Sequence, residues 1–440
     1  MNSTFCLTAV GDVYLAKRLR DESHPGFLEV ASLLRAGEAR FGNIEMLLHD
    51  YDSAPAAQCQ GAWAAAPTHL AEEIDWLGVN LASLAHNHTS DYGHGGVAST
   101  RQALDRLKIT HAGTGLHLAA ARAPSYLETS SGRCALIAAT STFLPQAPAG
   151  YQRADALGRP GVNPLRFETV YEVDDTAFKA LERLLAEIPA RPLRGHREGP
   201  MQHRGAADGA LDFMGNRFVQ AKAFAVRSRC NLVDLVEICA SVAEARSQAD
   251  WVVVSIHSHE YDRTQEEPPA FVTEFSRAAI DAGADIVIGH GPHVLRGVEV
   301  YNGRPILYSL GAFVFQPYLF PQQPADFYEA LGLDRDASLE DAYALRSKGG
   351  GFFENRKFWE TVVVRCEFGP AETRLVFHPI DLLTGIEDTT GLPMVAKGEQ
   401  GLAILNRLIG LSEPLTQRFT IDRNACTATL VIHRNQSKSS

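Results

Sequence analysis

The sequence predicts an α/β protein in which two mixed β-sheets pack together and helices cover them. Over the first 140 residues, short apolar strands alternate with amphipathic helices, which is typical of a largely parallel sheet covered on both faces. The same alternation returns after about residue 230, and hairpins follow near the C-terminal end. Parallel strands early and antiparallel hairpins late indicate two sheets that pack against each other.

The N-terminal elements follow from runs of β-branched and apolar residues bounded by glycine and polar turns, separated by segments with helical spacing. We expect strands at 5–10, 39–44, 79–85, 109–112 and 134–139, and helices at 26–34, 69–77 and 97–107. Further on, the apolar runs 251–256 and 284–288 predict buried strands next to helices at 234–247 and 271–282.

In the last third of the chain the sequence pattern changes from alternating strands and helices to antiparallel hairpins. Asn302-Gly303 predicts a tight hairpin between strands 298–301 and 304–310, because both residues readily adopt the positive φ of such a turn. A second antiparallel pair is expected at 361–366 and 374–378. A helix at 402–409 and a strand at 427–432 end the pattern.

A chain of 440 residues could hold one domain or two, and we expect a single domain over residues 1–434. It would carry an insertion at about 145–229, rich in Pro, Gly, Arg and His, with one helix at 176–187. A mobile flap is expected at about 316–357 and a disordered tail at 435–440. The insertion either shapes a substrate pocket or is a surface excursion without a role.

Composition excludes several classes of function. The chain is 45% hydrophobic and 21% charged, and its formal net charge of −11 is spread along the sequence. This argues against a surface for nucleic acid or anionic lipid. Seven dispersed cysteines without a CxxC pair fit a reducing cytoplasm. The N-terminus lacks a basic signal region and no run approaches about 20 apolar residues, so we expect a cytoplasmic protein without a membrane segment.

Polar, metal-competent residues follow several of the predicted strands. His290 and His293 follow strand 284–288, and residues of the same kind end other strands: Asp12, Glu45, Asn87, His88, Asp91, His257 and His259. Each alone could be a turn former, a helix cap or a satisfied buried imidazole. As a set they should share one edge of the sheet. Oxygen donors mixed with imidazoles suit a divalent ion, and neutral histidine also serves as a base near pH 7.

These segments also resemble a known family. Gly11-Asp12, Asn43-Ile44-Glu45, the stretch 87–93, His257-Ser258-His259 and the stretch 289–294 are similar to the motifs of the CapA capsule-synthesis family. That family is a branch of the calcineurin-like metallophosphoesterase superfamily. The resemblance covers nearly the whole chain and implies a four-layer α/β/β/α fold with a metal site on the loops at one edge.

The metal ligands that the resemblance and the strand ends indicate are Asp12, Glu45, Asn87, His257, His259 and His290. Ca²⁺ or Mn²⁺ is the expected ion, with Zn²⁺ or iron as alternatives. The chain departs from the superfamily pattern at Tyr14, where a histidine is usual, at Ser258 and at Ala312. A site that binds two metal ions needs ligands for both, and these departures put the number of ligands in doubt. One bound ion is therefore at least as plausible as two.

The resemblance extends to a branch that acts in lasso-peptide biosynthesis and inverts a C-terminal residue of a precursor peptide. Such an epimerase needs two acid/base groups across the substrate. The candidates are His88, His257, His290 and His293, oriented by Asp12 and Asp91. The substrate would be a peptide or polyamide, and its carboxylate could be held by Arg159, Asn163 and Arg296, although each arginine alone is more often solvated or in a structural ion pair.

Two other functions remain open. One is a metal-dependent hydrolase of a phosphoester or amide bond, closer to the usual chemistry of the superfamily. The other is an accessory protein of poly-γ-glutamate or capsule synthesis, against which the missing membrane anchor counts. The sequence does not separate the epimerase from the hydrolase.

Overall fold

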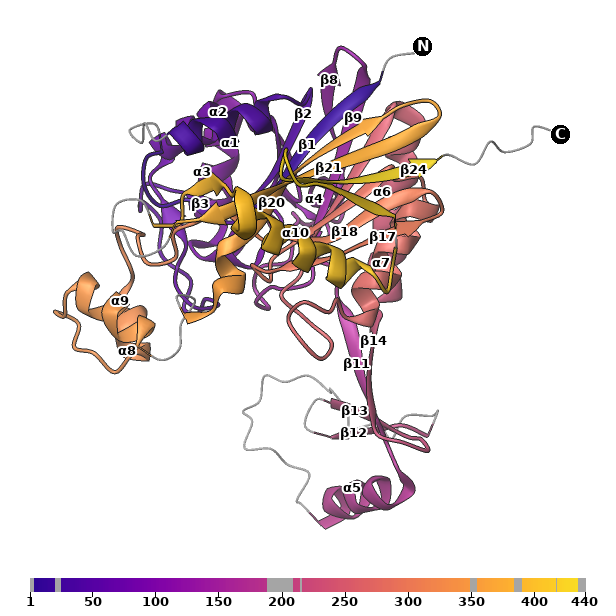
Figure 1. The fold of residues 1–440 in the computed structure, drawn as a ribbon. Helices are drawn as coiled ribbons and strands as arrows, with labels where there is room; N and C mark the ends of the chain where they lie inside the picture. The colour runs from indigo at the N-terminus through magenta and orange to yellow at the C-terminus, as the bar shows by residue number, and fades with distance from the viewer. Residues whose placement is uncertain are drawn as a thin grey trace.

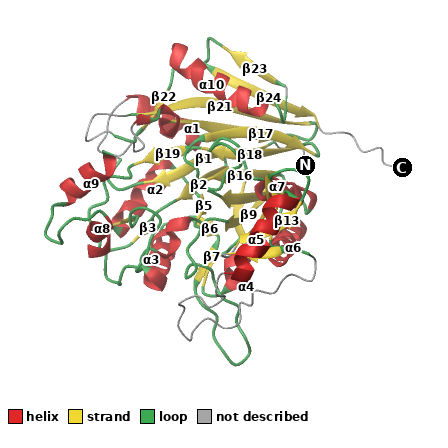
Figure 2. Ribbon diagram, turned by 90° about the horizontal axis from the view of Figure 1, so that it is seen from below, coloured by secondary structure: helices red, strands yellow, loops and turns green. Residues whose placement is uncertain are grey.

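The computed structural model describes residues 4–19, 25–187, 209–213, 216–348, 354–383, 390–416 and 418–433. Two large mixed sheets pack face to face, with helices on their outer sides (Figures 1 and 2). The first sheet is parallel in the half that reaches one edge and antiparallel in the other half, whereas the second sheet is parallel at its centre with an antiparallel strand at each edge.

The first sheet has ten strands in the order β23-β24-β21-β20-β1-β2-β5-β6, with β19 beside β1 and β22 beside β21. The bounds are β1 (Phe5–Tyr14), β2 (Ala39–Ile44), β5 (Leu81–Ser83), β6 (Thr110–Ala112), β19 (Ala312–Phe315), β20 (Glu360–Phe368), β21 (Glu372–Leu382), β22 (Pro393–Val395), β23 (Phe419–Asp422) and β24 (Thr427–His433).

The second sheet has six strands in the order β17-β18-β16-β15-β9-β8. Their bounds are β8 (Ser125–Thr129), β9 (Gly132–Thr140), β15 (Trp251–His257), β16 (Ile286–His290), β17 (Leu295–Tyr301) and β18 (Arg304–Leu310). The predicted Asn-Gly hairpin is present between β17 and β18.

Side chains of the second sheet alternate between two cores. On β9, Leu136 and its alternate neighbours face the first sheet, whereas Ile137 packs with the helices α6 (Leu232–Gln248) and α7 (Ala270–Asp281). The outer face of the first sheet is covered by α1 (Pro25–Arg35), α2 (Ala71–Leu77) and α3 (Gly93–Arg106). Helix α10 (Gly398–Ser412) contacts both β17 and β21 and spans the two sheets. The expected four-layer α/β/β/α fold is confirmed.

Two excursions leave this sandwich. A four-stranded sheet of β11 (Phe167–Val173), β12 (Leu211–Phe213), β13 (Asn216–Gln220) and β14 (Ala225–Cys230) projects with α5 (Asp175–Glu187) from one end (Figure 1). Helices α8 (Ala325–Ala330) and α9 (Leu339–Ser347) form the other. They fall inside the predicted insertion and flap. Parts of both, at 188–208, 214–215 and 349–353, lie outside the described residues, as does the tail 435–440. The single-domain division stays a prediction.

Smaller elements complete the chain: β3 (Leu47–Leu48), β4 (Ala65–Ala66), β7 (Thr114–Gly115), β10 (Gly161–Val162), α4 (Leu118–Arg122) and the 3₁₀ turns η1 (Thr68–Leu70), η2 (Asn87–Ser90) and η4 (Arg356–Trp359). Among the described helices, none has both the length and the apolar character needed to cross a bilayer.

Some predicted bounds are wrong. Strand 79–85 shrinks to β5, because the chain leaves the sheet after Ser83. The first strand instead continues to Tyr14, because β19 pairs with its C-terminal part at Asp12, where the ladder shifts register. The sequence analysis missed β8, β19 and all strands of the projecting sheet.

Candidate metal centre

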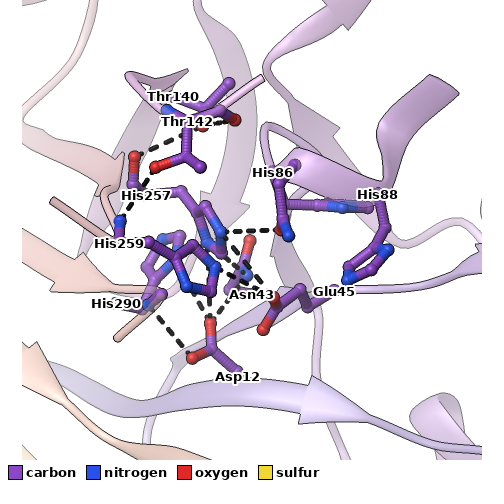
Figure 3. A network of polar contacts seen from close by, with 12 residues as sticks. Asp12, Asn43, Glu45, His86, His88, Thr140, Thr142, His257, His259 and His290 are labelled. Atoms are coloured by element: carbon purple, nitrogen blue, oxygen red, sulfur yellow. Dashed lines mark hydrogen bonds and ion pairs between the residues drawn. The ribbon is translucent and has the colours of Figure 1, made fainter. Parts of the chain in front are cut away.

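Six side chains converge where the C-terminal ends of strands from both sheets meet (Figure 3). They form two groups of three potential ligands: Asp12, His257 and His290 in one, and Glu45, His259 and His293 in the other. Each group takes its carboxylate from the first sheet, on β1 or just after β2. Each takes one imidazole from the end of β15 and one from the end of β16. The two groups therefore repeat one arrangement.

The first cluster is fully buried. His290 Nδ1 lies 3.4 Å from Asp12 Oδ1 and 3.0 Å from His257 Nδ1. His257 Nδ1 is 3.8 Å from the same Asp12 oxygen. On the other side of its ring, His290 Nε2 lies 2.7 Å from the Ser255 hydroxyl, which fixes the ring and leaves Nδ1 toward the carboxylate.

The second cluster adjoins the first. Glu45 Oε1 lies 3.5 Å from His259 Nε2 and Oε2 lies 3.6 Å from His293 Nδ1. Two contacts join the clusters, since Asp12 Oδ2 is 3.2 Å from His293 Nδ1 and Glu45 Oε1 is 3.7 Å from His257 Nε2. The two clusters therefore form one continuous group of polar side chains, which is called the nest below.

Backbone shape at the end of β16 places His293. Its φ is +58°, in the left-handed region that non-glycine residues rarely enter, and Gly291 before it has a φ of +113°. A Cβ on Gly291 would lie 2.9 Å from the backbone nitrogen of Ser258, so the turn needs glycine there. The Gly291 amide donates to Asp12 Oδ2 at 3.0 Å.

Two asparagines hold the nest together. Asn43 donates from Nδ2 to Asp12 Oδ1 at 2.9 Å, and the same nitrogen lies 3.3 Å from His257 Nδ1. Asn87 Oδ1 lies 3.0 Å from His257 Nε2. Asn87, which the sequence predicted as a metal ligand, therefore reaches the centre with its amide oxygen, and its role as a ligand stays a prediction.

His88 stands apart from the clusters. Its Nδ1 lies 2.7 Å from Asp91 Oδ2, and the same oxygen accepts the backbone amide of Ala64 at 2.8 Å. Tyr14 stands where the superfamily usually has a histidine, and its ring centroid is 5.5 Å from that of His88 and 6.3 Å from that of His293. The four histidines expected as bases thus divide, with three in the clusters and His88 beside them.

Burial dominates the electrostatics. Burial alone would raise the pKa of the Asp12 carboxyl, but hydrogen bonds from His290 and His293 lower it well below its usual range. Burial, together with the negative charge of Asp12, raises the pKa of Glu45 well above its usual range. Burial also lowers the pKa of the His257 and His259 imidazoles, which favours the neutral form that binds metals.

These residues fit divalent ions. Both carboxylate oxygens of Glu45 are buried without a hydrogen-bond partner in the described part of the chain, and so is His259 Nε2. A buried carboxylate without a hydrogen-bond donor is costly unless a cation meets it. One ion could be held by Asp12, His257 and His290, and a second by Glu45, His259 and His293. Mixed carboxylate and imidazole donors suit Mn²⁺, Fe²⁺ or Zn²⁺ better than Ca²⁺, because Ca²⁺ prefers ligands that are all oxygen.

The predicted substrate-binding residues are dispersed. Asn163 is buried, and both polar atoms of its side-chain amide already form hydrogen bonds. Its Oδ1 accepts from Arg122 Nε at 3.2 Å, and its Nδ2 donates to the Ala138 carbonyl at 2.9 Å. Arg296 is buried and donates to the carbonyls of Gln265 and Glu260. Arg159 is exposed and donates to the Pro148 carbonyl at 3.0 Å. Asn163 and Arg296 therefore support loops, and a role of any of the three in substrate binding stays a prediction.

The sequence analysis did not assign Asn43 or Ser255 to the site. Both are polar residues at fully buried positions of the largely apolar strands β2 and β15. That pattern was a usable signal, because a polar side chain on a buried strand needs a partner. Their partners here are Asp12 and His290.

Comparisons with known proteins place the chain among capsule-related proteins. The model of the family described as "Bacterial capsule synthesis protein PGA_cap" matches residues 6–317. A Sinorhizobium fredii protein, "Uncharacterized protein y4sH", is 34% identical over 434 residues, 95% of this chain and 91% of the relative. "PGA biosynthesis protein CapA" of Bacillus subtilis is 42% identical over 114 residues, 26% of each chain. "Capsule biosynthesis protein CapA" of Bacillus anthracis is 24% identical over 322 residues, 71% of this chain and 60% of the relative.

Proposed function

The chain belongs to the PGA_cap family of bacterial capsule synthesis proteins, and from that premise we propose that it is a metal-dependent enzyme acting on an amide bond of a polyamide substrate. The predicted CapA resemblance is confirmed. The names of the two Bacillus relatives concern capsule and PGA biosynthesis, which fits the predicted accessory role in polymer synthesis better than lasso-peptide epimerisation.

The observation that carries this proposal is the pair of adjoining clusters, each with one carboxylate and two imidazoles. From sequence, one ion was at least as plausible as two, because Tyr14 replaces a usual ligand. The repeated arrangement favours two, since His259 and His293 supply donors beside Glu45 without Tyr14. Two neighbouring ion sites suit hydrolysis, in which the attacking and leaving groups both need stabilisation.

Divalent ions bound there would supply Lewis-acid polarisation of the scissile carbonyl. The protein's own groups do the rest. Ser255 and Asn43 hold His290 and Asp12 in fixed orientations. Asp91 engages Nδ1 of His88, so Nε2 is the nitrogen left to give a proton to the leaving amine. In the hydrolysis one water molecule adds to the scissile carbonyl and the C–N bond breaks, which gives a carboxylate and the protonated amine; burial of the clusters limits the reaction to water admitted to the site.

One observation keeps the epimerase as a second candidate. Figure 3 shows His88 on the opposite side of Glu45 from His290, and an epimerase needs acid/base groups on two faces of the substrate. Against it, His290 Nδ1 already faces Asp12 and its Nε2 faces Ser255. Amide hydrolysis, in contrast, requires only one proton donor outside the clusters, and in this proposal His88 is that donor.

The test uses the full chain with poly-γ-glutamate in D₂O, with Mn²⁺ or with EDTA. We expect new amino ends that appear only with the metal, without deuterium at Cα. The Glu45→Gln variant should lose this activity, whereas Glu73→Gln, a buried carboxylate remote from the clusters, should keep it. Deuterium at Cα without cleavage would establish the epimerase instead. Metal-dependent release of p-nitrophenol from bis(p-nitrophenyl) phosphate, with the polyamide intact, would establish a phosphoesterase.

A further inference from the structure

A cavity of about 480 Å³ lies at the turn η2, which also reaches the candidate metal centre. Its lining includes Ser90, the last residue of η2, and Gly93 and His94, which begin α3. The same turn carries Asn87, whose Oδ1 contacts His257, and His88, which lies beside the clusters. The cavity and the candidate metal centre therefore share the turn η2 as a common wall.

The cavity offers hydrogen-bond donors without partners. Ser90 is only 6% exposed, and its hydroxyl has no hydrogen-bond partner among the described residues, although it lines the cavity. Helix α3 is 14 residues long, and its N-cap residue Tyr92 provides no side-chain cap for the first-turn amides. Uncapped amides at a helix N-terminus carry a partial positive charge and attract anions.

The charge of the lining fits an anion as well. Among the described residues that line the cavity, none is Asp or Glu, in a chain whose formal net charge is −11. Gln58, Gln146 and His94 supply further polar groups. Most other lining residues are alanine, glycine or proline, so the backbone of an extended ligand can come close to the wall.

We propose that this cavity is a subsite that binds a carboxylate of the substrate chain, at the hydroxyl of Ser90 and the first-turn amides of α3. The inference rests on the proposed function, because it assigns the substrate class of the same centre: a polyamide that carries repeated carboxylates. Binding one carboxylate beyond η2 would hold the neighbouring amide bond near the clusters. The site has no Lys or Arg in its described lining, which suits a singly charged carboxylate better than a phosphate dianion.

The test measures binding apart from turnover, by calorimetry on EDTA-treated full-length protein. The probe is a γ-linked glutamate pentamer, and its counterpart has every side carboxylate amidated. Ala57 lines the cavity and is exposed, so it accepts substitution without repacking the core. Ala57→Glu places a like charge in the cavity and should weaken binding of the pentamer by at least about tenfold, since two charges a few ångströms apart near a surface repel by that much. The matched Ala57→Gln should stay within about twofold, because it adds the same bulk without charge.

Ser90→Ala should also weaken binding, by about three- to tenfold, through loss of one hydrogen bond to a charged group. Equal binding by wild type and Ala57→Glu, equal binding of the amidated counterpart, or displacement of the pentamer by millimolar inorganic phosphate would each overturn the carboxylate subsite. Failure of metal-dependent cleavage with charge-selective binding intact would count against the proposed function alone.

Discussion

Glu45 gives a sharp test of the candidate metal centre, because its effect on stability should change sign with metal. Both of its carboxylate oxygens are buried without hydrogen-bond donors in the described chain, and the Asp12 carboxylate lies in the same nest. Without metal, the folded protein must either bury the Glu45 charge beside Asp12 or take up a proton to neutralise it, and at pH values above the ordinary pKa of glutamate both cost free energy that Glu45→Gln removes. Its amide can also donate to Asp12. We therefore expect the metal-free variant to be more stable than metal-free wild type.

The size of the effect follows from general magnitudes. Leaving a buried polar group unpaired costs about 1–3 kcal/mol and more when it is charged, so we take a gain of about 2 kcal/mol for the variant. Unfolding entropy of about 2.1 cal/mol/K per residue gives roughly 0.9 kcal/mol/K for 440 residues. The melting temperature of metal-free Glu45→Gln should therefore rise by about 2 °C.

Bound metal should reverse the order of the melting temperatures, so that wild type becomes more stable than Glu45→Gln. An ion at 100 times its dissociation constant stabilises the folded state by about 2.7 kcal/mol, which corresponds to about 3 °C here. Wild type should show this increase on addition of Mn²⁺, and Glu45→Gln should lose most of it. Differential scanning calorimetry with EDTA and with Mn²⁺ measures both terms.

Glu73 is the matched control. It is equally buried, but its Oε2 accepts the Leu19 amide at 2.9 Å and its Oε1 lies 3.4 Å from Arg18 Nε. Glu73→Gln should lower the melting temperature with and without metal. If metal-free Glu45→Gln melts below metal-free wild type, as Glu73→Gln does, the nest does not hold an uncompensated charge and the argument for an ion beside Glu45 fails.

Three further changes probe other parts of the molecule. Ser255→Ala frees the ring of His290 and should weaken Mn²⁺ affinity about 10- to 100-fold by calorimetry; unchanged affinity would deny Ser255 its positioning role. His88→Gln should leave the metal-dependent rise in melting temperature intact while lowering the rate of polyamide cleavage by about 10²- to 10⁴-fold, and an unchanged rate would remove His88 from the mechanism. Burial would raise the pKa of the Asp234 carboxyl, but hydrogen bonds from Arg166 lower it overall. Ionised Asp234 therefore stabilises the folded state at pH values above the unfolded pKa of about 3.9. This stabilisation is lost as pH falls through the lower pKa of the folded state. Asp234→Asn should cost about 3–5 kcal/mol in urea unfolding at pH 7, and the difference between wild type and variant should shrink as pH falls below the unfolded pKa of about 3.9; a difference independent of pH would contradict the ion pair.

Much of the centre could be predicted because it depends on local order along the chain. Glu45, His257 and His290 each lie at or just past the end of a strand and Asp12 lies close to the end of β1, and parallel strands bring such ends to one edge. The grouping of His293 with Glu45 and His259 was not predictable in the same way. It depends on the positive φ values of Gly291 and His293, which no pattern in the sequence specifies.

Contacts between distant segments also escaped the sequence analysis. β19 pairs with β1 although about 300 residues separate them, and this pairing lengthens the first strand through Asp12. β11 and β13 pair in parallel within the projecting sheet, across a stretch with weak periodicity. The cavity beside η2 gave no signal either, because alanines and glycines in loops carry no chemistry until the fold brings them together.

The division of ligands between the sheets links metal binding to the fold. The first sheet supplies only the carboxylates Asp12 and Glu45 to the two clusters, and the second supplies only imidazoles. Ions shared between them would tie the two sheets together at this edge, whereas without metal burial favours the neutral form of His257 and His259 opposite the two carboxylates. Local opening of the sandwich should therefore begin at this edge in the metal-free protein. Hydrogen exchange at the backbone amides of His257 and His290 should then slow when metal is added, while exchange at the opposite ends of β15 and β16 should not change.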